Sequence, residues 1–489
     1  MHDDPHQQSA HLAHLSAHEI LQRLSAGDLT SLDLVDTLLE RIIEVDAPES
    51  DVALNSIAAV SADARAVARE RDDERATGRL RGPLHGVPVV IKDNIEARGL
   101  PGLAGSTALI GRPSRDAPLV TRLREAGAVV LASTNLSQWA NLRSPRSTSG
   151  YSATAGLVAN PWALDRSPGG SSSGSGAALA AGFAPLAVGT ETDGSIVSPS
   201  SVNGVTGLKP TVGAVPTTHV VPISASQDSP GPMARSVADV ALMYGVLARS
   251  APAAFTSPPS IVVAQNWRTG HPTTDSLFDQ LVKTFVAAGL TVNRRDVAEP
   301  GESEGRDELT VLLCELVDDL SAYLADRPGK GVRSLADVIA YEDEHRDIEQ
   351  IWFGHEHFLE AIETGGRRGP YYAEARRRNL QWAIETCLTP GIEGADVIIA
   401  PACGPSWKSD LCIGGHPGPT SPVTTPAAIA GWPILSLPMG LVDDLPVGLA
   451  IVGRPGSEWM MLDAASHLER IIHTESTLSH PLWARPSRG

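Results

Sequence analysis

The sequence is poor in cysteine, and its few cysteines are scattered. Four occur among 489 residues, and no two of them form a C-x-x-C pair. This excludes a disulfide framework and any zinc or redox motif built on paired cysteines. We therefore expect Cys314, Cys387, Cys403 and Cys412 to be free thiols.

Positive charge and long apolar runs are also scarce. The 39 basic residues face 57 acidic ones, for a net charge of −18. Such a chain repels phosphate backbones and anionic lipid, so we expect neither nucleic acid nor a membrane as partner. Its longest apolar run is too short to span a bilayer. The first residues lack the basic and apolar regions of a secretory signal, which favours a cytoplasmic location.

Histidines, which are common metal ligands, gather near the N-terminus and in one later triplet. Helical spacing among the N-terminal histidines fits a solvated face as well as it fits adventitious metal binding. The triplet His355-Glu356-His357 is predicted to lie on a helix surface, because residues two apart on a helix do not face each other. We predict no metal site and no cofactor. The N-terminal histidines are His2, His6, His11, His14 and His18.

What the sequence does contain is a stretch, residues 168–201, with two glycine-flanked serine clusters around a short apolar run. The first cluster, residues 169–176, has too little apolar surface for a core strand, and its glycines permit a loop that presents hydroxyl and N–H groups. The second, residues 189–195, follows an apolar run, so Ser195 is expected on a tight turn beside a sheet. Nucleophiles are commonly presented in this way.

Two other interpretations of the stretch are weaker. A flexible Gly/Ser linker would not alternate with alanine-, leucine- and valine-rich segments. Residues 170–174 match the G-x-S-x-G nucleophile elbow, but that motif requires a buried strand immediately before it. Residues 160–168 contain two prolines and no apolar run.

A base for the serine is suggested upstream. Residues 86–91 form an apolar run typical of a buried strand, and the run ends at Lys92. A charge at the end of an interior strand is either paired, here with Asp93 or a surface carboxylate, or catalytic. The segment alone leaves both interpretations open.

Three motifs together resemble the amidase signature family: Lys92 in VPVVIKDN, Ser171 in GGSSSG and Ser195 in GTETDGS. The resemblance extends from about Leu15 to His467 and, within the family, is strongest to bacterial peptide amidases. It implies an α/β fold in which helices cover both faces of a mixed, largely parallel central sheet (α/β/α). It also implies a Ser–cisSer–Lys triad of Ser195, Ser171 and Lys92.

The chemistry implied by this resemblance is hydrolysis of an amide C–N bond through an acyl-enzyme. A cis peptide bond after Gly170 would let Ser171 relay the proton from Ser195 to a neutral Lys92. Burial of Lys92 is a plausible source of the lowered pKa that this requires. The backbone N–H groups of Thr192, Asp193, Gly194 and Ser195 would form the oxyanion hole.

Two departures from the family pattern bear on the substrate. Many members carry an arginine two or three residues after the nucleophile, where this chain has Val197 and Ser198. Its absence disfavours small dicarboxylate monoamides and the substrate mode of glutamyl-tRNA amidotransferase A subunits. Asp193 replaces the commoner glycine, as in peptide amidases.

These features favour C-terminal carboxamides of peptides, or similarly bulky amides, as substrates. Alternatives are an aryl or alkyl amide, ester or carbamate hydrolase of the same family, or the A subunit of a glutamyl-tRNA amidotransferase. A non-catalytic binding protein on the same fold is disfavoured because all three catalytic positions are filled.

Substrate contacts are expected from a long polar loop, residues 135–160, that passes over the active site. Asn141 and Tyr151 are candidates there, as is Trp139, although packing within the loop is an equally good explanation for each. Ser172, beside Ser171, is a further candidate.

We expect residues 1–489 to form a single amidase domain, with residues 1–75 as an N-terminal helical packing segment and residues 252–392 as a more variable, helix-rich excursion. A helix over 117–126 and a strand over 128–131 predict one βαβ crossover. The remaining predicted helices cover residues 175–183, 231–247, 275–288, 306–325, 334–362 and 371–387, and further strands cover 396–400, 433–437 and 448–452.

Overall fold

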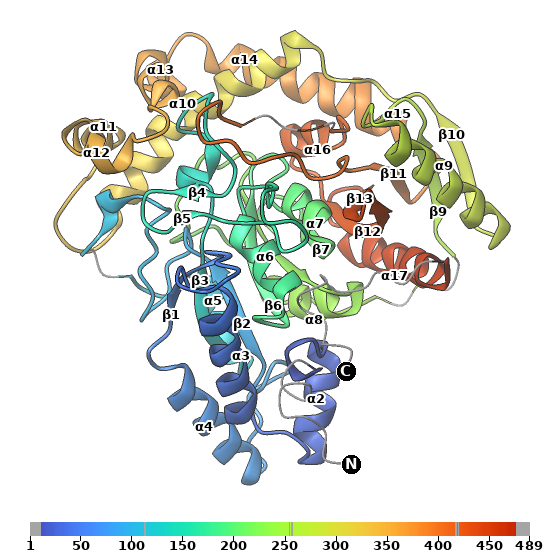
Figure 1. The fold of residues 1–489 in the computed structure, drawn as a ribbon. Coiled ribbons are helices and arrows are strands. Elements are labelled where there is room, and N and C mark those ends of the chain that lie inside the picture. Colours follow the sequence, from blue (N-terminus) through green and yellow to red (C-terminus); the bar gives the residue numbers. More distant parts are fainter. Residues whose placement is uncertain are drawn as a thin grey trace.

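The computed structural model describes residues 11–111, 114–253, 255, 258–415, 418 and 420–475. An 11-stranded sheet runs through these residues in the order β1-β3-β2-β6-β8-β7-β12-β13-β11-β9-β10 (Figure 1). The strands are β1 (Ile57–Val60), β2 (Pro88–Lys92), β3 (Val129–Thr134), β6 (Leu186–Glu191), β7 (Thr206–Lys209), β8 (Ser229–Ala234), β9 (Ser260–Ala264), β10 (Thr291–Arg295), β11 (Val397–Pro401), β12 (Ile434–Val442) and β13 (Leu445–Val452). A small separate hairpin pairs β4 (Tyr151–Ser152) with β5 (Gly156–Leu157).

The sheet is mixed. Parallel pairs form two blocks, β3-β2-β6 and β11-β9-β10, and antiparallel pairs through β8, β7, β12 and β13 join the blocks. Strand β1 adds to β3 in the antiparallel sense. The predicted mixed sheet covered by helices is therefore confirmed.

Two groups of helices cover the sheet. Helices α6 and α7 pack on each other and on β6, β12 and β13, whereas α5, α8, α9 and α17 form a second layer. The helices are α2 (Ala17–Ala26), α3 (Ser31–Val45), α4 (Ala64–Ala76), α5 (Pro118–Glu125), α6 (Ser173–Ala181), α7 (Val197–Asn203), α8 (Val237–Ala248), α9 (Pro272–Ala287), α10 (Glu302–Asp326), α11 (Leu335–Glu344), α12 (Arg346–Glu349), α13 (Glu356–Thr364), α14 (Tyr372–Leu380), α15 (Thr389–Gly391), α16 (Thr424–Ala430) and α17 (Glu458–Glu475). No helix in the described ranges is long and apolar enough to cross a membrane.

The parallel block around β2 carries the elements predicted from the sequence. Strand β2 is buried along its whole length and pairs in parallel with β3, to which α5 connects it. The predicted βαβ crossover is therefore confirmed. Strand β6 lies on the other side of β2, so the end of the Lys92 strand and the start of the Ser195 turn are neighbours.

Helix α6 begins at Ser173, within the first serine cluster, and every one of its residues is buried. A Cβ atom added at Gly174 would lie 2.3 Å from the carbonyl oxygen of Ser56 and 2.5 Å from that of Asn135. A side chain cannot fit at that distance, so the helix depends on small residues to approach its neighbours. This explains the alanine and glycine pattern of the segment.

Three predictions about local structure were wrong. Residues 231–234, predicted to start a helix, belong to strand β8, and the helix begins only at Val237. Proline usually disfavours a central strand. Here β7 pairs only with Met233 and Ala234, so Pro230 and Pro232 lie where β8 has a partner strand on one side.

The second and third errors fall in the excursion. The helix predicted over 334–362 is broken into α11, α12 and α13. His355, predicted to be solvated, precedes α13 and is only 5% exposed. Its Nδ1 lies 2.9 Å from Glu342 Oε2, so a buried polar contact joins the segments on either side of the break. Helical periodicity in the sequence does not predict such a contact.

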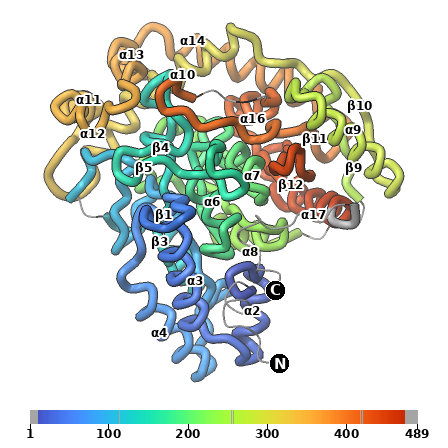
Figure 2. The backbone as a smooth tube through the Cα atoms, in the orientation of Figure 1, coloured from blue at the N-terminus to red at the C-terminus, as the bar shows by residue number. Residues whose placement is uncertain are grey.

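The N-terminal helices and the excursion lie far apart in the molecule. Helices α2, α3 and α4 lie at one end, and α10 to α14 lie at the opposite end (Figures 1 and 2). Thr30 caps α3 by accepting a hydrogen bond from the Asp33 N–H. Strand β1, between α3 and α4, was not predicted. His2 and His6 lie outside the described residues.

Candidate active site

The end of β2 places Lys92 against the first serine cluster. Lys92 is fully buried, and its Nζ lies 2.7 Å from Ser171 Oγ. The peptide bond between Gly170 and Ser171 is cis, as the family resemblance implies. Two segments far apart in sequence are thus joined by a single short contact between an amine and a hydroxyl.

Thr190, on the neighbouring strand β6, supplies the other partners of the amine. Lys92 Nζ lies 2.9 Å from Thr190 Oγ1 and 3.1 Å from Thr190 O. A neutral amine has two N–H bonds and one lone pair. It can donate both N–H bonds to Thr190 while its lone pair accepts the Ser171 proton.

Burial makes the neutral amine accessible near neutral pH. Desolvation lowers the pKa of Lys92 to about 7, and the negative charges of Asp228 and Glu191 partly oppose this shift. The pairing of Lys92 with Asp93, left open by the sequence, is not observed in the described part of the chain. The Asp93 carboxylate instead accepts backbone N–H bonds from Gly102 and Leu103.

Ser195 lies on a turn that leaves β6. The carboxylate of Glu191, the last residue of β6, accepts N–H bonds from Ile196 (2.6 Å) and Val197 (2.9 Å). Gly194 has a φ of 74°, a left-handed conformation that favours glycine. The Ser195 carbonyl accepts a hydrogen bond of 3.1 Å from the Ser172 N–H, which brings Ser195 next to the cis peptide.

The backbone of this turn offers free donors. Among the hydrogen bonds of the described residues, none uses the N–H groups of Thr192, Asp193, Gly194 or Ser195. Adjacent N–H groups with no partner on a tight turn can stabilise negative charge on an oxygen bound nearby. These are the four groups predicted to form an oxyanion hole.

Acidic side chains lie beside the turn. Thr425 Oγ1, on α16, donates a 2.8 Å hydrogen bond to Asp193 Oδ2. Glu308, on α10, is 8% exposed and accepts a 2.9 Å hydrogen bond from Gln227. Burial raises the pKa of both carboxyl groups, and the charge of Asp193 raises that of Glu308 further.

The predicted substrate contacts lie in three different environments. Ser172 Oγ is fully buried and bonded to the backbone of Thr190, so its hydroxyl supports β6. Tyr151 is buried edge-on against Phe353, with ring centroids 5.6 Å apart. Asn141 adopts a positive φ of 75° and carries a buried Oδ1 without a hydrogen-bond partner. Of these three candidates, Ser172 alone uses its side-chain polar atom in a hydrogen bond within the described part of the chain.

A buried arginine joins this loop to the excursion. Arg143 is fully buried and donates a 3.1 Å hydrogen bond to the carbonyl of Phe353, whose ring it also faces at 4.7 Å. Its Nη1 lies 3.5 Å from Glu342 and 3.7 Å from Glu349. The same two carboxylates accept hydrogen bonds from Trp139 and Gln138. Trp139 is therefore a packing residue of this network.

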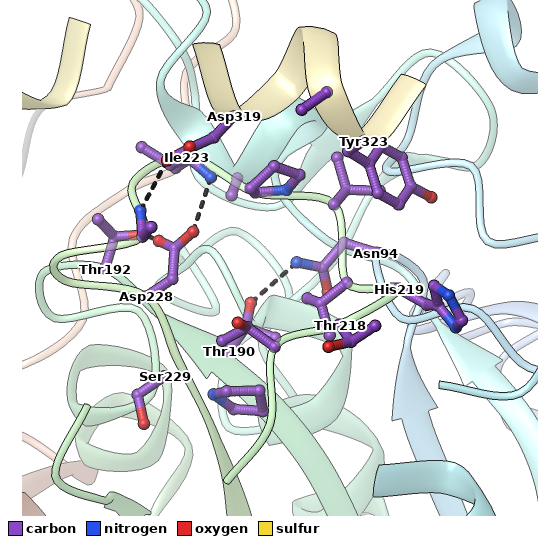
Figure 3. A pocket seen from close by; sticks show the side chains of 18 of the residues that line it. Asn94, Thr190, Thr192, Thr218, His219, Ile223, Asp228, Ser229, Asp319 and Tyr323 are labelled. Carbon is purple, nitrogen blue, oxygen red and sulfur yellow. Dashed lines mark hydrogen bonds between the residues drawn. The ribbon is translucent and has the colours of Figure 1, made fainter. Parts of the chain in front are cut away.

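A cavity of about 290 Å³ opens beside Thr190 (Figure 3). Its wall includes Asn94, Thr190, Thr192 and Asp228. Asn94 Nδ2 donates a 3.0 Å hydrogen bond to Thr190 Oγ1, the same hydroxyl that faces Lys92. The cavity therefore adjoins the partners of the amine.

Sequence reasoning missed the residues that support this arrangement. Thr190, Asn94, Glu191 and Asp228 carry hydrogen bonds or charge to the site, yet no local pattern distinguishes them. The one signal available was that Thr190 and Glu191 lie within the second glycine-flanked cluster.

The four cysteines are free thiols, as predicted. Among the described residues, no group of three or more His, Cys, Asp or Glu could hold a metal ion.

Comparison with known proteins identifies the family. The family model described as Amidase matches residues 33–462. The solved peptide amidase PAM, in complex with the inhibitor chymostatin, is 38% identical with a TM-score of 0.89, covering 95% of this chain and 98% of its own. A native peptide amidase structure from Stenotrophomonas maltophilia gives 38% identity and a TM-score of 0.87, with the same coverage.

Curated relatives extend the comparison beyond peptide amidases. A putative amidase of Schizosaccharomyces pombe is 32% identical over 91% of this chain and 83% of its own length. The A subunit of the glutamyl-tRNA(Gln) amidotransferase of Symbiobacterium thermophilum is also 32% identical, over 94% and 96%. The family match spans most of the chain, and the fold agrees with it. The chain is an amidase and belongs to the amidase signature family.

Proposed function

We propose that this amidase is a serine hydrolase that cleaves peptide C-terminal carboxamides, or similarly bulky amides, with Ser195, Ser171 and Lys92 as its catalytic triad. The observation that carries the proposal is the 2.7 Å contact between Ser171 Oγ and a fully buried Lys92 whose pKa is lowered to about 7. A base at that pKa removes protons at neutral pH without a metal or cofactor.

The proposed reaction runs through an acyl-enzyme. Ser195 Oγ attacks the amide carbonyl carbon while its proton passes through Ser171 to neutral Lys92. The N–H groups of residues 192–195 stabilise the negative oxygen of the tetrahedral intermediate. The C–N bond then breaks, the leaving amine takes the proton back from Lys92 through Ser171, and water hydrolyses the acyl ester by the same route.

Three observations support peptide amides as the substrate class. The relatives described as peptide amidases share 38% identity and nearly the full chain length. The turn carries Asp193, two residues before the proposed nucleophile. Its buried Oδ1 has no hydrogen-bond partner among the described residues and can accept an N–H bond from a peptide backbone. Val197 and Ser198 leave no cation after Ser195 to bind the carboxylate of a small diacid monoamide.

A second candidate is the A subunit of a glutamyl-tRNA amidotransferase, favoured by the 32% identity over 94% of the chain to the Symbiobacterium protein. That function requires partner subunits and glutaminase activity. Aryl or alkyl amides, esters and carbamates remain alternative substrates of the same triad. We also propose one amidase domain over residues 1–489, because β1, β10 and β13 belong to one sheet.

The test is a hydrolysis panel on the purified chain, with peptide carboxamides, anilides, aliphatic amides, esters, carbamates and glutamine. We expect the largest kcat/KM for peptide carboxamides, and a mass increase equal to the acyl group on Ser195 when turnover is quenched. Ser195→Ala should abolish both. Ser175→Ala is the matched control, since it removes a buried α6 hydroxyl bonded to Thr134 and should retain activity. A parent protein that releases ammonia only from glutamine would favour the amidotransferase alternative.

A further inference from the structure

Asp228 lies just before β8, between the Ser195 turn and the loop that precedes β8 (Figure 3). Its two carboxylate oxygens have three donors. Thr192 Oγ1 donates to Oδ1 at 2.6 Å, and the N–H groups of Ile223 and Ser224 donate to Oδ2 at 2.8 and 2.9 Å. A carboxylate with this many short bonds is fixed in position.

The bond to Thr192 connects Asp228 to the proposed oxyanion hole. Thr192 is the first residue of the turn whose N–H groups have no other partner among the described residues. Glu191 anchors the far side of the turn through Ile196 and Val197. Asp228 anchors the near side, so the four donors are held between two carboxylates.

The charge of Asp228 also reaches the base. Lys92 is subject to two nearby negative charges, from Asp228 and from Glu191 on β6, and both raise the pKa that burial lowers. Asp228 in turn faces Asp319 on α10, and burial raises the pKa of Asp228 to about 6. This pKa lies below that of Lys92, so Asp228 loses its proton before Lys92 does as the pH rises.

We propose that Asp228 is a positioning residue with two effects: it holds Thr192 at the start of the oxyanion turn, and its carboxylate, in the cavity that adjoins the partners of Lys92, places negative charge near the proposed base. The inference rests on the proposed Ser195 chemistry. Asp228 would then act on both the oxyanion turn and Lys92. Lys92 precedes Asp228 by more than a hundred residues in the sequence.

The charge effect is tested with Asp228→Asn. Asparagine can keep all three bonds, since its oxygen accepts from Ile223 and Ser224 and its amide donates to the Thr192 hydroxyl, which can also act as acceptor. Loss of the negative charge makes the Lys92 ammonium less stable. We expect the acidic limb of the pH–rate profile to move to lower pH by about half a unit or more, with the plateau rate retained within a few-fold.

The positioning effect is tested with Thr192→Val, which leaves the charge in place. The plateau rate should fall about tenfold because a hydrogen bond to a charged group is lost, whereas the acidic limb should stay close to that of the parent. Thr192→Ser, which restores a hydroxyl, should recover most of the rate.

Rates are best measured twice, as peptide carboxamide hydrolysis and as phosphonylation of Ser195 by a fluorophosphonate. In the second reaction Ser195 Oγ bonds to phosphorus, fluoride leaves, and the serine proton passes to Lys92, so it reports activation of the nucleophile without any amide. The reacting fraction also counts folded sites. A parent protein that reacts with the probe but cleaves no amide would refute the proposed substrate while leaving the role of Asp228 testable.

Asp326→Asn is the matched control, because it neutralises a carboxylate of the same cavity that is not among the charges acting on Lys92 or Asp228. It should leave the limb in place. If the acidic limb of the pH–rate profile of Asp228→Asn coincides with that of the parent, the charge effect is refuted. A Thr192→Val plateau equal to that of Thr192→Ser overturns the positioning effect.

Discussion

Lys92 and Lys209 are two lysines that the fold buries completely, each at the end of a strand in the same sheet. Burial lowers the pKa of Lys92 to about 7 and that of Lys209 to about 8. Their surroundings differ. Lys92 lies within 2.7–3.1 Å of neutral oxygens of Ser171 and Thr190, whereas the one hydrogen bond described for Lys209, to the Pro210 carbonyl, is 3.5 Å long.

The charges around Lys209 complete the contrast. Three carboxylates, Glu191, Asp193 and Glu458, raise its pKa against burial. Lys209 in turn lowers the pKa of Glu191 and Asp193. Burial alone therefore does not make a base. A hydroxyl in contact distinguishes Lys92, the proposed base, from Lys209, whose charge opposes the rise in pKa that burial causes in Glu191 and Asp193.

The largest effect should come from Lys92→Met. Removing the base should lower kcat/KM by at least about a thousandfold, whereas the folded state should be as stable as the parent, because an apolar side chain of similar length replaces a buried amine. Amide hydrolysis and thermal unfolding, measured on the same preparation, check both parts. A variant that turns over as fast as the parent would contradict the base assignment.

Lys209→Met should lower the stability of the fold more than it lowers activity. The charge of Lys209 lowers the pKa of Glu191. Without that charge the buried Glu191 carboxylate becomes costly, and the free energy of unfolding should fall by about 2–3 kcal/mol. Because Glu191 also holds the N–H groups of Ile196 and Val197, some activity should be lost with it. Urea unfolding of the two methionine variants side by side gives the comparison, and equal stabilities would remove the distinction between the two lysines.

Thr190→Val tests the contact between Lys92 and its neighbouring hydroxyl. It removes the hydroxyl that lies 2.9 Å from Nζ, and the rate should fall about tenfold. The matched substitution on the strand of Lys209 is Thr206→Val, at the other end of β7. That buried hydroxyl has no hydrogen-bond partner among the described residues, so its loss should leave kcat/KM unchanged. Similar rate losses in both variants would point to a general packing effect.

The smallest effect is the pH dependence of the parent. Only neutral Lys92 accepts a proton, so activity should fall as pH drops through its pKa of about 7. We expect kcat/KM at pH 7 to be roughly half its plateau, and at pH 6 roughly a tenth. Lys209→Met should show the same fall in activity at low pH, the acidic limb of the pH–rate profile. An acidic limb centred near pH 10 would mean that burial does not lower the Lys92 pKa appreciably.

The two lysines also indicate how far sequence alone can lead. Lys92 was found because a charge that ends a long apolar run is anomalous, and the serine clusters were found through their glycines. Lys209 ends a shorter segment rich in glycine and threonine, and no role was predicted for it. Both positions are fully buried, but only the longer run signals this in the sequence.

Residues that act through long-range contacts could not be predicted. Asp228 reaches Thr192 only because β8 pairs with β6, and β8 itself was predicted as a helix start because its prolines mask the strand. His355 was predicted to be a surface residue, but the structure places Glu342 beside it. Helical or strand periodicity describes one element at a time and carries no information on such pairs.

The buried Arg143 has a practical consequence for anyone who wishes to redesign the rim of this enzyme. An exchange of the excursion for that of a relative would leave a guanidinium in the interior without counter-charges unless Glu342, Glu349 and the Phe353 carbonyl came with it. Successful chimaeras should therefore be those whose donor sequence carries both acids, or whose recipient loop has lost the arginine.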